Sequence, residues 1–95
     1  MDEKTAYQQK AEAQLKELKA NIDRLKAKAE QADADAKIEM QKQVASFEAK
    51  KDQITSNLSR LQSSAGQAME DLKNGTEKAF FELKASVQEA IDRFS

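Results

Sequence analysis

Hydrophobic residues in the first third of the chain recur at alternating intervals of four and three residues. The series runs through Ala11, Leu15, Leu18, Ile22, Leu25, Ala29, Ala32 and Ala36. In heptad notation Leu15 and Ile22 occupy a positions, and Leu18 and Leu25 occupy d positions. Three to four heptads of this kind are enough to predict a coiled coil. The pattern therefore predicts an amphipathic helix whose apolar seam packs against another helix.

The seam continues through Met40, Val44 and Phe47. This wider spacing is a stutter, which unwinds a left-handed supercoil locally without ending the helix. We therefore expect one long helix over residues 4–62. The alternative is a loop over residues 31–35, which divides the chain into three helices of similar length. The Ala-Asp-Ala-Asp sequence in that segment has neither Gly nor Pro and so favours the continuous helix.

The second half of the chain has a period of eleven residues. Four segments, which begin at Asn57, Ala68, Ala79 and Ala90, each have an apolar residue at the second position and another three residues later. Eleven residues close three helical turns, so the apolar stripe runs nearly straight or slightly right-handed along the helix. The repeat predicts an amphipathic C-terminal helix over residues 67–94.

Two short segments are candidates for breaks in these helices. Ser-Ser-Ala-Gly at residues 63–66 lies in a Ser-rich stretch and is the best candidate for a hinge. Asn-Gly-Thr at residues 74–76 has the residues that end one helix and cap the next. The eleven-residue phase runs through both segments, which favours a helix that continues through Gly75 at a cost of about 1 kcal/mol relative to Ala. If the hinge closes, the last helix folds back on residues 38–61 as a hairpin.

These patterns predict an all-α protein with a single helical domain over residues 1–95, arranged as a coiled-coil oligomer or a helical hairpin. The apolar stripes are too narrow to fill a wide core, and a chain of this size buries only about 60–65% of its surface. Self-association would cover more of the seam, so we expect the chain to form a homo-oligomer. The predicted seam residues are Leu15, Leu18, Ile22, Leu25, Phe47, Ile54, Leu58, Leu61, Met69, Leu72, Phe80, Leu83, Val87, Ile91 and Phe94.

Phe81 falls outside this seam. On a wheel of eleven residues in three turns, it lies about 140° from the centre of the C-terminal stripe. Met69, Phe80 and Ile91 coincide in that stripe, with Leu72, Leu83 and Phe94 next to them. We expect Phe81 to be exposed, either as an isolated surface aromatic or as a second contact to another subunit or a client protein, and we prefer the second interpretation.

The polar border of the C-terminal stripe allows two kinds of partner. Lys73 and Lys84 flank the stripe, whereas Asp71, Glu82 and Glu89 lie on the opposite side. Border lysines are typical of helices that lie on a lipid surface, and also of helices that pack on a partner helix, because Lys stems cover the seam edge. The acidic polar face favours the partner helix and leaves a weak lipid contact as the alternative.

The composition offers little chemistry. The 95 residues include no His, Cys, Trp or Pro and only two Gly. There is no glycine-rich phosphate loop, and carboxylates such as Asp33 and Asp35 diverge on a helix and lack calcium-loop spacing. We therefore expect no enzymatic activity, no catalytic residues, no cofactor and no metal site.

Charge and hydropathy bear on partners and location. The net charge is −1, and acidic residues interleave with the one locally basic stretch, residues 16–28, so we expect no nucleic-acid binding. No apolar run approaches the roughly 18 residues of a transmembrane helix, and the N-terminal residues do not resemble a signal peptide. Because the chain has no Cys, nothing points to an oxidising compartment, and we expect a cytoplasmic location.

Residues 7–16, 22–29 and 34–39 carry a resemblance to known proteins. They are similar to a group of small, uncharacterised bacterial coiled-coil proteins, which often have a Trp where this chain has Met69 or Phe80. The resemblance covers nearly the full length and implies a cytosolic, stress-associated helical protein with no assigned activity. The C-terminal repeats also resemble those of exchangeable apolipoproteins and desiccation-related proteins, which implies surface or lipid contact.

The leading prediction is thus a non-enzymatic, self-associating coiled-coil scaffold or stress-related interaction protein. The alternative is an amphipathic helical protein that binds a lipid surface or a client reversibly. A third hypothesis is a desiccation-type protein that is largely disordered until it binds, and the regular seam of the first half argues against it.

Overall fold

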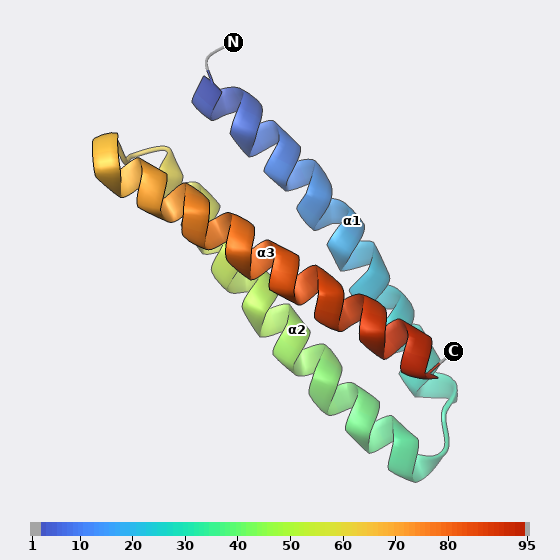
Figure 1. Ribbon diagram of the computed structural model, residues 1–95. Coiled ribbons are helices and arrows are strands. Elements are labelled where there is room, and N and C mark those ends of the chain that lie inside the picture. Colours follow the sequence, from blue (N-terminus) through green and yellow to red (C-terminus); the bar gives the residue numbers. More distant parts are fainter. Residues whose placement is uncertain (1–2, 95) are drawn as a thin grey trace.

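Three helices of nearly equal length account for almost all of residues 3–94, the part of the chain that the computed structural model describes (Figure 1). Helix α1 spans Glu3–Gln31, α2 spans Ala34–Leu61 and α3 spans Gly66–Phe94. The molecule is elongated, with principal extents of 50 × 21 × 17 Å. The prediction of an all-α protein is confirmed.

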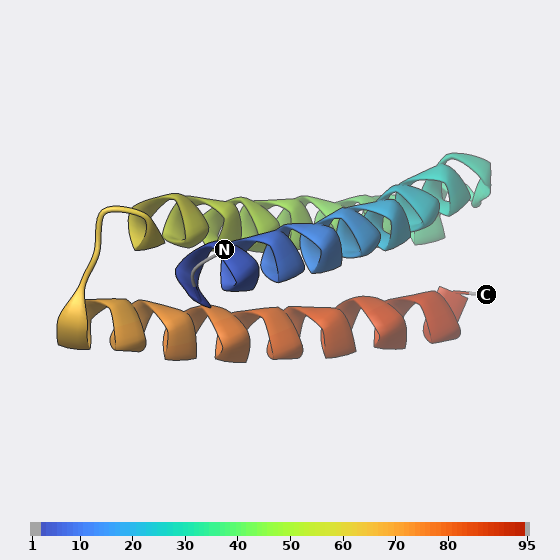
Figure 2. The same ribbon diagram turned by 90° about the horizontal axis from the view of Figure 1, so that it is seen from above.

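The helices run up, down and up along a common direction. α1 and α2 are antiparallel neighbours, and α3 returns antiparallel to α2 and parallel to α1 (Figures 1 and 2). The start of α1 therefore lies at the same end of the bundle as the α2–α3 connection. The end of α3 lies near the α1–α2 connection.

The single helix expected over residues 4–62 is wrong, because the chain turns back between α1 and α2. Asp33 is the N-cap of α2, with φ −68° and ψ 169°. Its carboxylate accepts a hydrogen bond from the backbone N–H of Ala36 at 3.1 Å. An aspartate cap satisfies a helix donor that otherwise has no partner, so this turn needs neither Gly nor Pro. The alternative of a loop over residues 31–35 describes the break that the structure contains.

The second break, at residues 62–65, lies close to the hinge expected at residues 63–66. The hydroxyls of Ser63 and Ser64 donate to the carbonyl of Arg60 at 3.1 and 2.9 Å and so occupy an acceptor at the end of α2. α3 then begins at Gly66, whose φ of +61° lies in the left-handed region. The helix predicted over residues 67–94 is confirmed, and it passes through Gly75 without interruption.

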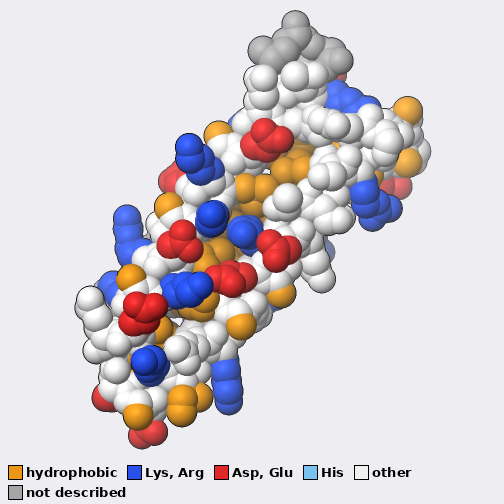
Figure 3. All heavy atoms as spheres, turned by 180° about the vertical axis from the view of Figure 1, so that it is seen from behind, with side chains coloured by type: hydrophobic (Ala, Val, Ile, Leu, Met, Phe, Trp, Pro, Cys, Tyr) orange, Lys and Arg blue, Asp and Glu red, His pale blue; other side chains and the backbone are white. Residues whose placement is uncertain are grey.

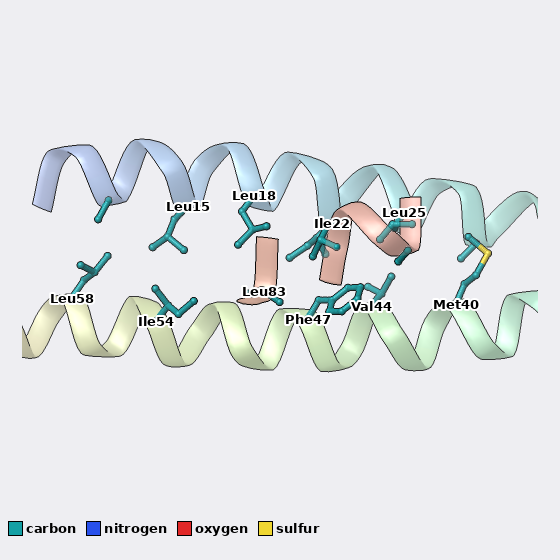
Figure 4. Close-up of a cluster of buried hydrophobic side chains, with 14 residues drawn as sticks. Leu15, Leu18, Ile22, Leu25, Met40, Val44, Phe47, Ile54, Leu58 and Leu83 are labelled. Carbon is teal, nitrogen blue, oxygen red and sulfur yellow. The ribbon is translucent and has the colours of Figure 1, made fainter. Parts of the chain in front are cut away.

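One apolar core runs along the bundle between the three helices. In Figure 4, Leu15, Leu18 and the other labelled residues of α1 point toward those of α2, and Leu83 enters from α3. The buried core residues are Ala11, Leu15, Leu18, Ile22, Leu25, Ala29, Met40, Val44, Phe47, Ile54, Leu58, Leu83, Val87 and Ala90. The chain therefore covers much of its own apolar seam by folding.

The buried face of α3 is rotated from the expected one. Leu83, Val87 and Ala90 are buried, whereas the stripe centred on Phe80 and Ile91 is only half-buried. The rotation follows from packing, because α3 must contact both α1 and α2, and its most buried edge is the one that faces the crevice between them.

Polar contacts join the helices at both ends of the bundle. The Lys4 ammonium donates to the carbonyls of Gln62 at 2.7 Å and Ser64 at 3.0 Å, where a cation is favourable because it meets the negative end of the α2 dipole. At the opposite end, Arg93 and Glu39 form an ion pair at 2.8 Å between α3 and α2. These contacts help to define which helix ends meet.

A buried glutamine interrupts the apolar seam near the first end. The side-chain amide of Gln8 donates to the carbonyl of Leu58 at 2.8 Å, and its oxygen accepts from Gln62 at 3.1 Å. Gln8 occupies an a position one heptad before Leu15. The predicted seam begins at Leu15 and does not include it. The partners of Gln8 are Leu58 in the last turn of α2 and Gln62 at the C-cap of that helix, so α1 and α2 are held in one register there.

Candidate interaction surface between α1 and α3

The least extensive helix interface in the bundle is the one between α1 and α3. A groove of about 300 Å³ lies there, between the N-terminal half of α1 and the middle of α3, with Ile54 of α2 at its base. Ala11 is short and Gln14 is polar, so neither of these α1 side chains fills this space with apolar volume. The groove is lined by Tyr7, Lys10, Ala11, Gln14, Leu15, Ile54, Thr76, Glu77, Phe80, Phe81 and Lys84.

Two consecutive phenylalanines line this groove and differ in how deeply they are buried. Neighbouring residues on a helix point about 100° apart. Phe80 packs against the core and is half-buried, whereas Phe81 is 74% exposed at the rim. The exposure of Phe81 agrees with the helical wheel of the sequence. Burying the ring of Phe81 against another surface would stabilise a complex by up to about 1.5–3 kcal/mol.

Tyr7 closes one end of the groove. Its hydroxyl donates to the carbonyl of Lys73 at 3.4 Å, and the Lys73 ammonium lies 5.2 Å from the centre of its ring. Burial, and secondarily the negative charge of Glu77, raises the pKa of Tyr7 above its usual value. The phenol is therefore neutral at physiological pH and remains a hydrogen-bond donor.

Charges of both signs surround the groove. Lys10 of α1 and Lys84 of α3 contribute positive charge, and Glu77 of α3 contributes negative charge. On the face of the bundle opposite to the view of Figure 1, acidic and basic side chains also alternate on either side of a strip of apolar side chains (Figure 3). That face has no large area of a single sign that would attract a polyanion.

A second exposed large hydrophobic residue lies far from this groove. Ile38, in the first turns of α2, is 55% exposed. Its neighbours line none of the groove, and the helix ends near it are joined through Glu39 and Arg93. Ile38 therefore provides an internal comparison for Phe81.

The residues predicted to form the seam fall into two groups. The structure buries most of them between helices of the same chain, and leaves the rest half-buried along α3. The buried group is Leu15, Leu18, Ile22, Leu25, Phe47, Ile54, Leu58, Leu61, Leu83 and Val87. The half-buried group is Met69, Leu72, Phe80, Ile91 and Phe94.

The sequence pattern does not predict the groove, because the groove depends on how α1 and α3 are placed relative to each other. The one local signal was a pair of adjacent phenylalanines, of which only one fits an apolar stripe. Thr76, which the sequence suggests as a helix cap, is also buried and lines the groove.

Other kinds of site are not apparent in residues 3–94. No three side chains of His, Cys, Asp or Glu lie close enough together to hold a metal ion in this part of the chain. Over the same residues, no helix has the length and apolar character needed to cross a membrane.

No protein-family model, curated protein or solved structure matches this chain. The resemblances noted in its sequence therefore remain predictions. The geometry of the groove carries the functional argument: an apolar base, an aromatic rim and flanking charges suit the recognition of an amphipathic helix.

Proposed function

We propose that the protein is a non-enzymatic helical interaction module that associates reversibly with a second copy of itself through the α1–α3 groove and Phe81. The observation that carries this proposal is the 74% exposure of Phe81 beside a groove with an apolar base. Binding energy in an interface is usually dominated by a few residues near its centre, among which aromatic side chains that fill a pocket are common.

The intramolecular core supports a different mode of association from that of a simple coiled coil. Residues such as Ile22 and Leu25 are already buried within one chain and need no partner. Among the described residues, the large apolar side chains left exposed are Phe81 and Ile38, and most of the half-buried ones lie along α3. Self-association through this limited surface is expected to be weak and reversible, because joining two molecules costs an estimated 4–15 kcal/mol of lost freedom.

A measurement of mass against concentration tests the proposal directly. Sedimentation equilibrium of the wild type should show a monomer–dimer equilibrium, and Phe81→Ala should shift it toward the monomer. Ile38→Ala removes the other large hydrophobic side chain that is exposed within residues 3–94 and should leave the equilibrium unchanged. Circular dichroism of the variants at low concentration shows whether each remains folded. A wild type that stays monomeric at high concentration, or an equal effect of the two variants, would contradict the proposal.

The second candidate function is reversible binding to a lipid surface or a client through α3. It is supported by the half-buried Phe80, Ile91 and Phe94, by Lys84 at the border of this stripe and by the short connection over residues 62–65. If α3 separated from the bundle at this connection, its apolar face would become available. Titration with neutral and anionic vesicles distinguishes this function, because it predicts vesicle binding by a chain that does not self-associate.

The broader role remains part of the proposal. A scaffold or stress-related function and a cytoplasmic location rest on the sequence resemblance. Reversible self-association is compatible with that role, since it makes the assembled fraction depend on protein concentration.

A further inference from the structure

α3 carries a second, outward-facing stripe in addition to its buried face. The residues recur at intervals of three, four, three and four, so that they are neighbours on one side of the helix. The stripe consists of Asn74, Glu77, Phe81, Lys84 and Gln88, and all five are exposed. Phe81 is its single apolar member and lies at its centre.

The charges of this stripe are arranged with opposite signs on the two sides of Phe81. Glu77 lies one turn toward the N-terminus, and Lys84 lies about one turn toward the C-terminus. Neither residue forms an ion pair within residues 3–94. Nearby charges include Lys73 and Lys78 on α3, together with Lys10 across the groove.

This arrangement is complementary to itself in one orientation only. At a rise of 1.5 Å per residue, Glu77 lies about 6 Å and Lys84 about 4.5 Å along the axis from Phe81. In an antiparallel pair of α3 helices with a two-fold axis at Phe81, Glu77 of each copy therefore lies within about 1.5 Å in height of Lys84 of the other. A parallel pair would place Glu77 against Glu77 and Lys84 against Lys84.

We propose that two copies associate about a two-fold axis at Phe81, with their α3 helices antiparallel and with Glu77 of each copy paired with Lys84 of the other. The inference rests on the proposed self-association and specifies its geometry. The contact is isologous, so it closes at a dimer and does not propagate into a filament. The two Phe81 rings meet near the axis and cover the mouths of the two grooves.

The test exchanges charges between copies. In Glu77→Lys alone, two lysines of each chain face two lysines of its partner, and in Lys84→Glu alone, glutamates face glutamates. Each variant should dimerise about ten-fold more weakly than the wild type, from the loss of two exposed pairs. An equimolar mixture of the two variants should form a heterodimer tighter than either homodimer, because both pairs are restored. The double variant Glu77→Lys, Lys84→Glu should recover dimerisation on its own.

Glu82→Lys is the matched control. It makes the same change in net charge on α3, but Glu82 faces the α2 side of the helix, where it lines a hollow with Asn57 and Ser86. It should leave the dimerisation constant within about two-fold of the wild type, since surface charges away from a contact act only through screened long-range terms. Helicity at low concentration, measured for every variant, separates weakened association from lost folding.

The outcomes separate this inference from the proposed function. A wild type that does not self-associate overturns both. A wild type that dimerises through Phe81, but whose Glu77→Lys and Lys84→Glu variants show no preference for each other in the mixture, overturns the antiparallel arrangement and leaves the proposed function standing. A heterodimer that is preferred over both homodimers supports the arrangement if its advantage in affinity decreases at high salt.

Discussion

The two glycines should respond in opposite directions to the same substitution. Gly75 lies inside α3, and Gly66 begins the same helix with φ of +61°. A methyl group added at either position would meet no atom within 4 Å. Packing therefore contributes little to either change, and the backbone conformation decides the sign.

The expected magnitudes follow from the local backbone. Ala is favoured over Gly in a helix interior by about 1 kcal/mol, so Gly75→Ala should raise the melting temperature by about 4–8 °C for a domain of this size. A left-handed conformation costs an L-residue roughly 1–2 kcal/mol. Gly66→Ala should consequently lower the melting temperature by a similar amount.

Thermal unfolding followed by far-ultraviolet circular dichroism measures both variants under conditions in which the melting of the wild type does not depend on protein concentration. A fall in melting temperature for Gly75→Ala would refute the reasoning, because it would mean that the chain turns at residues 74–76 and needs glycine there. The same sign for Gly66→Ala and Gly75→Ala would also contradict the backbone that the structure describes.

Three further predictions concern the core, the buried glutamine and the tyrosine. Ile22 is 1% exposed, so Ile22→Ala should cost about 2–5 kcal/mol in urea unfolding, and a loss well below 1 kcal/mol would argue against the core packing. Gln8→Ala removes the hydrogen bonds to Leu58 and Gln62 and should cost about 1–2 kcal/mol by the same assay, whereas Gln9→Ala, at the exposed neighbouring position, should have little effect. Because burial raises the pKa of Tyr7 in the folded state, its ultraviolet absorbance should titrate above the usual pKa of a tyrosine, 10.0. The stabilisation linked to the neutral phenol is present below that pH and is lost as pH rises through the folded pKa. Tyr7→Phe should remove this part of the pH dependence of stability. An identical pH dependence in the variant would contradict the prediction.

Much of the local structure of this protein was determined by its sequence alone. The periodic seam around Leu18 and Ile22 and the eleven-residue repeat both predicted helix, because helix propensity and amphipathic spacing are properties of neighbouring residues. The bounds of α3, its continuity through Gly75 and the exposed position of Phe81 followed from the same local information.

The break between α1 and α2 depended on the tertiary structure. The Ala-Asp-Ala-Asp segment is compatible with a continuous helix and with a turn capped by Asp33, and its local preferences do not separate the two. Turning back allows Met40 and Phe47 to bury against α1 within one chain, a long-range gain that no local pattern contains. From the sequence alone, a loop over residues 31–35 was therefore only the alternative to a continuous helix.

The candidate interaction surface was also decided by tertiary packing. The sequence indicated that Phe81 lies off the main stripe, but it did not indicate that Tyr7 and Ala11 of α1 lie across from it. The rotation of α3 depends on the shape of the crevice between α1 and α2, which buries Leu83 and Val87 and leaves Phe80 at the edge. Helix periodicity specifies which residues share a face, whereas the balance of packing among three helices decides how deeply each part of that face is buried.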